Sequence, residues 1–156
     1  VIFLAYLALI ACWGDVQRVL QYHGAEHKVI HCFEHQAQLV PSSARRFSTR
    51  HPRCGTSFIL TVMIVSIVLF SLFGWPSPAQ RIIIRLGLLP LVAGLSYELI
   101  RLIARKEWFI CKLLGAPGLW LQALTTREPD EGQIEVAIRA LQAVLEPVSE
   151  KEPCTI

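Results

Sequence analysis

The chain has 156 residues, of which 53% are hydrophobic and 17% are charged, with a formal net charge of +3. Soluble domains usually carry about 25% charged residues, so the composition predicts an all-α protein built as a polytopic membrane helical bundle. The small positive charge, without a basic surface interleaved with aromatic residues, argues against nucleic-acid binding. Five cysteines without paired spacing argue against a disulfide framework and favour a reducing, cytoplasm-facing location.

The chain opens with an apolar run, VIFLAYLALIACW, and begins without Met. A membrane-spanning helix needs about 20 mostly apolar residues. We therefore expect residues 1–13 to be the end of a truncated span, with the N-terminal part of the protein missing from the sequence. A helix over 15–36 is expected to continue out of this span into the cytoplasm.

Within that helix, YHGAEHKVIHCFEH has a histidine at every fourth position. Residues four apart lie about 40° and roughly 6 Å from one another on a helix, so His23 and His27 can bind one metal ion together. With Glu26 they spell H-x-x-E-H, the inverted zincin pattern, in which the glutamate is the general base toward a metal-bound water. The alternative is a solvated helix face. His31 and His35 lie further along the helix and are predicted to be surface residues or hydrogen-bond donors to the metal-binding residues.

Residues 36–52 are expected to form a loop, and RHPRCGTSF follows. His51 and Cys54 have H-x-x-C spacing just before the next apolar helix, where Cys54 suits a metal ligand or a nucleophile. The start of that helix, beside Arg50 and Arg53, also suits an anion. The alternative is a turn whose arginines contact lipid headgroups.

Two further membrane spans are predicted, over 56–75 and 82–104, with the Pro-rich turn PSPAQ between them. The second contains Glu98. A carboxylate in hydrocarbon is costly and is a functional-site candidate, whereas pairing with Arg101 would give it a structural role.

Basic residues give the expected orientation, because cytoplasmic loops carry an excess of Lys and Arg. The segment 14–55 is rich in them, and the hairpin between the last two spans holds Arg81, with Arg85 just inside the helix. More basic residues follow the last span: Arg105, Lys106 and Lys112. We expect a multi-pass protein of the cytoplasmic (inner) membrane, with 14–55 and the C-terminal tail in the cytoplasm.

Residues 107–124 are expected to form interfacial helical segments broken at GAPG. The spacing of the apolar residues in the tail predicts a short amphipathic helix, with Ile134, Ala137, Ile138, Leu141 and Leu145 on one face. Residues 147–156 are expected to be disordered. The predicted division is a membrane domain, 1–128, which includes the His-rich helix and loop, and a cytoplasmic tail, 129–156.

An acidic turn precedes the amphipathic helix and contains Glu128 and Asp130. Its default interpretation is a solvated turn that caps the helix. The alternative is that one of these carboxylates completes the two-histidine site from the same side of the membrane.

The motifs YHGAEHK, HPRCGTSF, SYELIR and PGLWLQALTTREPDEGQIEVAI together resemble the YqhQ-like family of bacterial multi-pass membrane proteins. That family is a domain of unknown function described as a predicted metal-dependent enzyme. The resemblance covers nearly the whole chain and implies that it is the C-terminal half of a longer protein. Where the family often has two aspartates after the proline, this chain has Asp130 and then Glu131. The family's motif positions fall on His23, Glu26, His27, His51, Arg53, Cys54, Glu98, Glu128 and Asp130.

The functional prediction is a metal-dependent membrane hydrolase with a cytoplasm-facing site at the bilayer surface. His23 and His27 bind a divalent ion, of zinc type, and Glu26 is the base. A further ligand is expected from His51, Cys54, Glu98, Glu128 or Asp130. The substrate would carry an ester, amide or phosphoester bond in a membrane lipid or membrane-bound peptide.

Two alternatives stay open. One is a non-catalytic metal-binding protein, a sensor or assembly factor, with every coordination position filled. The other is a thiol enzyme with Cys54 as nucleophile and a histidine as base. The expected partners are membrane lipid and the missing N-terminal half, and the sequence leaves a homo-oligomer open.

Overall fold

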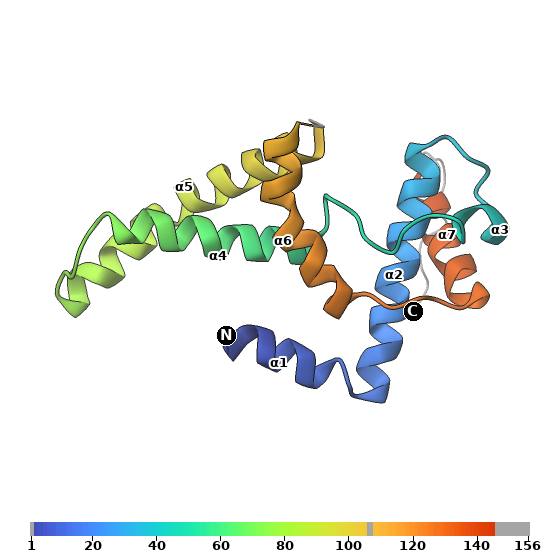
Figure 1. The fold of residues 1–156 in the computed structure, drawn as a ribbon, viewed down its shortest axis with the longest axis horizontal. Coiled ribbons are helices and arrows are strands. Elements are labelled where there is room, and N and C mark those ends of the chain that lie inside the picture. Colours follow the sequence, from blue (N-terminus) through green and yellow to red (C-terminus); the bar gives the residue numbers. More distant parts are fainter. Residues whose placement is uncertain (1, 106–107, 146–156) are drawn as a thin grey trace, which may run out of the picture. The chain divides into compact units, whose positions relative to one another are not determined.

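The computed structural model describes residues 2–105 and 108–145, and its regular structure in those ranges is entirely helical (Figure 1). This confirms the predicted all-α class. The helices are α1 (Ile2–Ile10), α2 (Gly14–Glu34), α3 (Pro41–Ala44), α4 (Gly55–Ser71), α5 (Pro78–Arg105), α6 (Phe109–Thr125) and α7 (Glu131–Leu145). The expected disorder of 147–156 concerns residues outside the described ranges.

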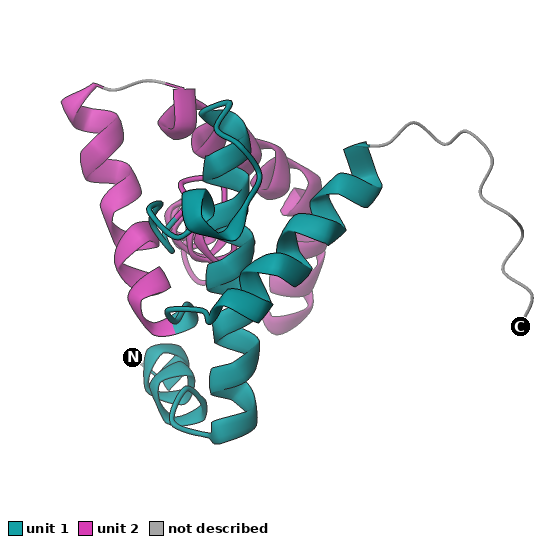
Figure 2. Ribbon diagram, turned by 90° about the vertical axis from the view of Figure 1, so that its right-hand side faces the viewer, with its two compact units in different colours: residues 1–50, 125–156 teal, residues 51–124 magenta. Residues whose placement is uncertain are grey.

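The chain forms two compact units, coloured separately in Figure 2. Unit 1 comprises Val1–Arg50 and Thr125–Ile156, and unit 2 comprises His51–Leu124. This division differs from the one predicted at residue 128. The described part of the tail is not an appendage, because α7 packs along α2 within unit 1.

Unit 1 has a small apolar core between α2, α3 and α7. Ala25, Val29 and Cys32 of α2 are almost fully buried, as are Ile134 and Ile138 of α7. The two isoleucines lie four residues apart and therefore on one face of the helix. The amphipathic helix predicted from this spacing is confirmed, with its apolar face on the His-rich helix.

The His-rich helix was expected over 15–36 and is observed as α2 with nearly the same bounds. The expected continuation from the first span is wrong, because α1 and α2 are bent by 98° at the break between them. At its other end, Gln36 has a φ of 53°. Its amide donates to Phe33 O and the Ala37 amide donates to Cys32 O, which is the Schellman pattern that ends a helix.

Unit 2 is built on a hairpin of α4 and α5, which lie side by side in Figure 1. The chain reverses near Gly74, whose φ of +64° suits glycine. The third helix, α6, runs unbroken through GAPG, so the predicted break there is wrong. These glycines allow close packing instead: a Cβ on Gly115 would lie 2.8 Å from Ile103 Cγ2, and one on Gly118 would lie 2.8 Å from Ser57 Oγ.

Among the described residues, α5 is the single helix that is long and apolar enough to span a bilayer by itself. Only 11% of its apolar window is buried in the structure. The other two expected spans correspond to shorter helices: α1 has 9 residues and α4 has 17. The loop expected over 36–52 also contains the short helix α3.

Candidate metal centre

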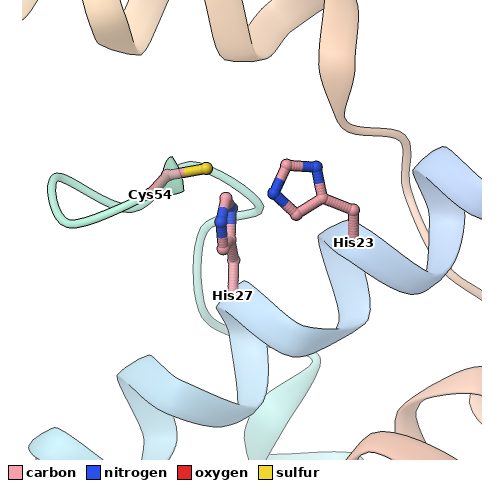
Figure 3. A group of neighbouring side chains, drawn as sticks. All are labelled: His23, His27 and Cys54. Atoms are coloured by element: carbon pink, nitrogen blue, oxygen red, sulfur yellow. The ribbon is translucent and has the colours of Figure 1, made fainter. Parts of the chain in front are cut away.

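The polar face of α2 carries His23 and His27 on successive turns (Figure 3, which also draws Cys54 of unit 2). Their ring centroids are 4.4 Å apart, and one ring nitrogen of each lies within 4.8 Å of the other. His27 is buried and His23 is half-buried. The spacing predicted from the sequence therefore does bring the two rings together.

Both rings are oriented by backbone carbonyls of unit 1. His23 Nδ1 lies 2.7 Å from Thr125 O, and His27 Nδ1 lies 2.6 Å from Thr49 O. A carbonyl oxygen can only accept a hydrogen bond, so Nδ1 of each ring is the donor. A neutral imidazole with its proton on Nδ1 has its lone pair on Nε2. Zinc-binding histidines in proteins are typically fixed in this way by a hydrogen bond from the other ring nitrogen.

Gly24, between the two histidines, lets the chain after α6 lie against α2. A Cβ on Gly24 would lie 2.1 Å from Arg127 O, a distance that no real side chain tolerates. The Arg127 amide also donates to Leu20 O at 2.9 Å. This contact holds residues 125–127 beside the helix and thereby places the Thr125 carbonyl at the His23 ring.

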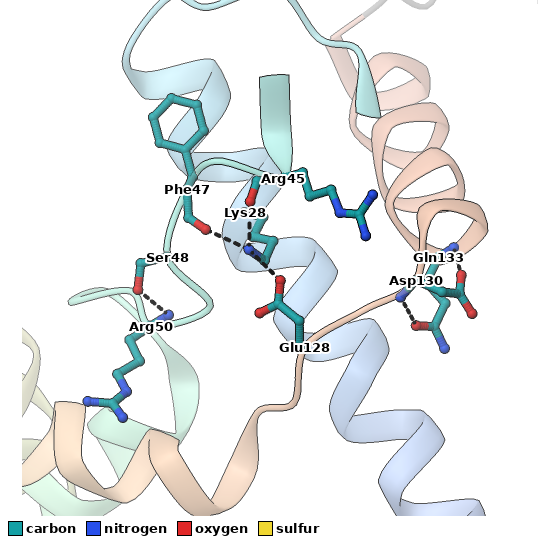
Figure 4. Close-up of polar contacts among 8 residues, drawn as sticks. All are labelled: Lys28, Arg45, Phe47, Ser48, Arg50, Glu128, Asp130 and Gln133. Atoms are coloured by element: carbon teal, nitrogen blue, oxygen red, sulfur yellow. Dashed lines mark hydrogen bonds and ion pairs between the residues drawn. The ribbon is translucent and has the colours of Figure 1, made fainter. Parts of the chain in front are cut away.

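Lys28 is the next polar anchor of α2 (Figure 4). Its side chain is 4% exposed, and Nζ donates to Arg45 O at 3.0 Å and Phe47 O at 2.7 Å. Nζ also pairs with the Glu128 carboxylate at 2.9 Å. Glu128, predicted as a candidate metal ligand, thus forms an ion pair with a buried lysine.

Asp130, the other acidic candidate, forms the start of α7. Its Oδ1 accepts a hydrogen bond from the Gln133 amide at 2.8 Å, and the Gln133 side chain accepts one from the Asp130 amide at 2.9 Å. These reciprocal bonds are a capping box, which matches the default interpretation of the acidic turn. The D-x-x-Q spacing was a signal for this cap.

Glu26 lies on a different part of the α2 surface from the two histidine anchors. It is exposed and borders a cavity of about 340 Å³ between α2 and α7, together with Tyr22, Val29 and Val136.

Further along α2, His31 Nε2 lies 2.9 Å from Arg50 O, and His35 Nδ1 lies 2.8 Å from His31 O. Cys32, on the same helix, is fully buried and donates to Gln38 O.

The remaining candidates belong to unit 2. His51 is buried, and its backbone N–H and C=O are both bonded to the side chain of Gln122, which is fully buried. Cys54 is 5% exposed and precedes the first residue of α4. Glu98 Oε1 accepts from Arg101 at 3.2 Å, which is the structural pairing considered from the sequence.

Several residues that build the site were not found by sequence reasoning. Thr49 and Thr125 act through backbone carbonyls, which carry no residue-type signal. Gln122 was not singled out either, although a Gln in an apolar helix is a recognisable polar exception. Lys28 was counted only for its charge.

Together these features define an all-α protein whose central helix carries two adjacent, oriented histidines. The chain belongs to the family described as "Protein of unknown function (DUF1385)", whose model matches residues 1–147. It is 40% identical over 146 residues to the uncharacterized protein YqhQ of Bacillus subtilis (strain 168). The match covers 93% of this chain and 46% of YqhQ, so the chain spans about half the length of that relative. No solved structure matches the chain.

Proposed function

We propose that the protein binds a divalent metal ion, of zinc type, through Nε2 of His23 and Nε2 of His27. The observation that supports this most is the pair of Nδ1 hydrogen bonds to the Thr125 and Thr49 carbonyls. They assign the lone pair of each neutral ring to Nε2. Zinc is bound by histidine nitrogen at about 2.0–2.1 Å, and the two ring centroids lie 4.4 Å apart on successive turns of one helix.

A zinc-type site needs at least one further ligand. Glu98, Glu128 and Asp130 each have a partner within their own unit, namely Arg101, Lys28 and the Gln133 amide. Recruiting any of them would mean replacing that contact. His51 and Cys54 also have contacts of their own, because His51 Nδ1 accepts from the Arg53 amide at 3.2 Å and Cys54 Sγ lies 3.2 Å from Thr56 Oγ1. Any further ligand would therefore exchange an existing contact for the ion.

We propose hydrolysis as the activity, on the basis of the H-x-x-E-H pattern. A zinc-type ion with an open position lowers the pKa of the water it holds to about 7. Glu26 would be the general base, which requires its carboxylate to come within hydrogen-bond reach of that water. The proposed substrates are ester, amide or phosphoester bonds of lipids or membrane-bound peptides.

One observation favours a second candidate, a metal site without catalysis. Glu26 is exposed and borders the cavity beside α7, whereas the two histidine rings contact Thr49 and Thr125. If Glu26 stays at that cavity, the metal serves a sensing or structural role. Substitution of Glu26 separates the two candidates.

We also propose that the protein is a multi-pass protein of the cytoplasmic membrane, with α4 and α5 as spans, α1 as the end of a further one, and α2 in the cytoplasm. The support is the apolar surface of the α4–α5 hairpin. Its helices expose Ile67 (68%) and Ile83 (70%), and the turn exposes Trp75 (93%). Side chains of this kind are stable against lipid and costly in water.

The test is elemental analysis of the detergent-purified protein. We expect about one transition-metal ion per chain in the wild type. His23→Asn/His27→Asn should lose it, because the Asn side-chain amide replaces the Nδ1 donor but offers no Nε2. The matched control, His35→Asn, changes an exposed histidine of the same helix and should keep the ion.

Turnover is measured on the same proteins with ester, amide and phosphodiester probes in mixed micelles. Loss of turnover with full metal content in Glu26→Gln supports the hydrolase, and unchanged turnover rules out Glu26 as the base. A wild-type protein without bound metal would refute the whole proposal.

A further inference from the structure

We propose that a cavity in unit 2 is a phosphate-binding pocket. The cavity has a volume of about 780 Å³ and lies between the start of α4 and the C-terminal end of α5. Three arginines are among the residues that line it: Arg53, Arg101 and Arg105. The argument for this pocket does not depend on a metal.

The charge of the lining selects an anion. Among the described residues that line the cavity there is no carboxylate. Glu98, one turn from Arg101, contacts that arginine from outside the lining at 3.2 Å. Guanidinium groups bind phosphate oxygens with paired N–H donors, which makes arginine the preferred residue for phosphate recognition.

The start of α4 adds to the same field. Cys54 and Gly55 border the cavity, and the 17-residue helix begins at Gly55. A helix N-terminus carries about half a positive charge, and its first amides point outward from the helix end. The arginines and the helix end therefore favour the same ligand charge.

The pocket is held by a buried polar network rather than by the arginines themselves. Gln122 of α6 bonds to both backbone groups of His51 and donates to Ser57 Oγ at 2.7 Å. The closeness of Gly118 to Ser57 fixes α6 against the start of α4. The segment 51–57 is thereby preformed, so a ligand need not order it.

The other side of the cavity is apolar, with Phe58 of α4 and Tyr97 and Ile100 of α5 in its lining. An anionic group beside apolar walls at the end of two apolar helices matches a phospholipid headgroup with its glycerol and first methylenes. Inorganic phosphate shares the recognised group but not the apolar part. The common chemistry is a phosphate anion, and the two sources are distinguished by experiment.

The test measures binding by the full chain in detergent, with EDTA present so that a metal site plays no part. Native mass spectrometry follows titration with phosphatidylglycerol, with phosphatidylcholine as the neutral-headgroup comparison, and ³¹P NMR follows titration with inorganic phosphate. We expect phosphatidylglycerol to bind more tightly than phosphatidylcholine. Arg101→Gln/Arg105→Gln should weaken it by about tenfold or more, since the charge-assisted hydrogen bonds to the phosphate are lost.

The matched control is Arg81→Gln/Arg85→Gln, at the opposite end of the same helix, where Arg81 and Arg85 lie over the rings of Trp75 and Phe70. Binding should change less than about twofold there, because these arginines do not line the cavity. Glu98→Gln should tighten binding by removing the carboxylate that competes for Arg101.

The outcomes are decisive in each direction. Binding of inorganic phosphate alone, with the same dependence on Arg101 and Arg105, assigns the pocket to free phosphate. Equal losses in both double variants would mean nonspecific attraction and would overturn the pocket. So would equal affinity for the two lipids together with no phosphate binding. Arg101→Lys/Arg105→Lys, which keeps the charge, guards against a folding defect and should retain part of the affinity.

Discussion

Gly24→Ala probes the contact that places the Thr125 carbonyl at His23. The new Cβ would lie 2.1 Å from Arg127 O and 3.2 Å from the Arg127 carbonyl carbon, so the segment 125–127 must move by about 1 Å or more. Overpacking of this kind costs about 1–3 kcal/mol. The shift also strains the Arg127–Leu20 bond and the His23–Thr125 bond, at about 1 kcal/mol each. The better helix propensity of Ala returns about 1 kcal/mol.

The net expectation is a loss of about 3 kcal/mol, which lowers the Tm of a chain of this size by about 6–12 °C. Thermal unfolding in detergent, followed by circular dichroism, measures it. Gly14→Ala in the same helix is the control, because nothing lies within 4 Å of its added Cβ. If both variants melt together and both keep the wild-type metal content, the close approach at Gly24 does not position the site and the reasoning fails.

Two further predictions concern buried groups of α2. Lys28→Met removes the donor to the Arg45 and Phe47 carbonyls and should lower the free energy of unfolding by about 2–4 kcal/mol. Glu128→Gln changes a side chain that is 68% exposed and should lower it by less than about 1 kcal/mol. Equal losses for the two variants in thermal unfolding would contradict this assignment. Burial raises the pKa of the Cys32 thiol, so it should react with iodoacetamide at pH 8 about tenfold more slowly than exposed Cys12. Because the unfolded thiol ionises first, the stabilising effect of this burial is complete below the unfolded pKa and falls as the pH rises through the folded value; peptide mapping that finds equal labelling would show that Cys32 is not buried.

The sequence predicted those parts of the fold that depend on periodicity. The apolar spacing of Ile134 and Ile138 defined α7 and its buried face, and the histidine spacing defined the polar face of α2. Both signals come from one helix at a time. What periodicity could not show is which helices pack together, and the packing of α7 on α2 joins segments more than 100 residues apart in the sequence.

Glycine and proline in the sequence were a poor guide to where a helix ends. GAPG was expected to break a helix, since glycine and proline are poor helix formers. In the structure Gly115 and Gly118 instead allow α6 to approach Ile103 and Ser57. The gain from close packing exceeds the propensity cost, and a sequence alone cannot reveal which of the two terms is larger.

For the candidate site, the two histidines and their spacing could be predicted from the sequence, but the groups that orient their rings could not. The residues that orient His23 and His27 act through the main-chain oxygens of Thr125 and Thr49. Any residue type supplies such an oxygen, so only the fold identifies it. By contrast, the role of Asp130 could be anticipated, because an acid before a helix is most often a cap, whereas the ion pair of Glu128 with Lys28 could not.

The arrangement of α2 would link the proposed metal binding to the stability of unit 1. His23, His27 and Lys28 hold residues 125, 49 and 45–47 by hydrogen bonds to backbone carbonyls. An ion at Nε2 draws electron density from each ring, which makes Nδ1–H a stronger donor to the same carbonyl. A ligand that binds only the folded state stabilises it by RT ln(1 + [L]/Kd), about 2.7 kcal/mol at a hundredfold excess over Kd. The proposed metal should therefore tighten the two segments flanking α2, and its removal should loosen them before the apolar core of Ala25, Val29 and Ile134 gives way.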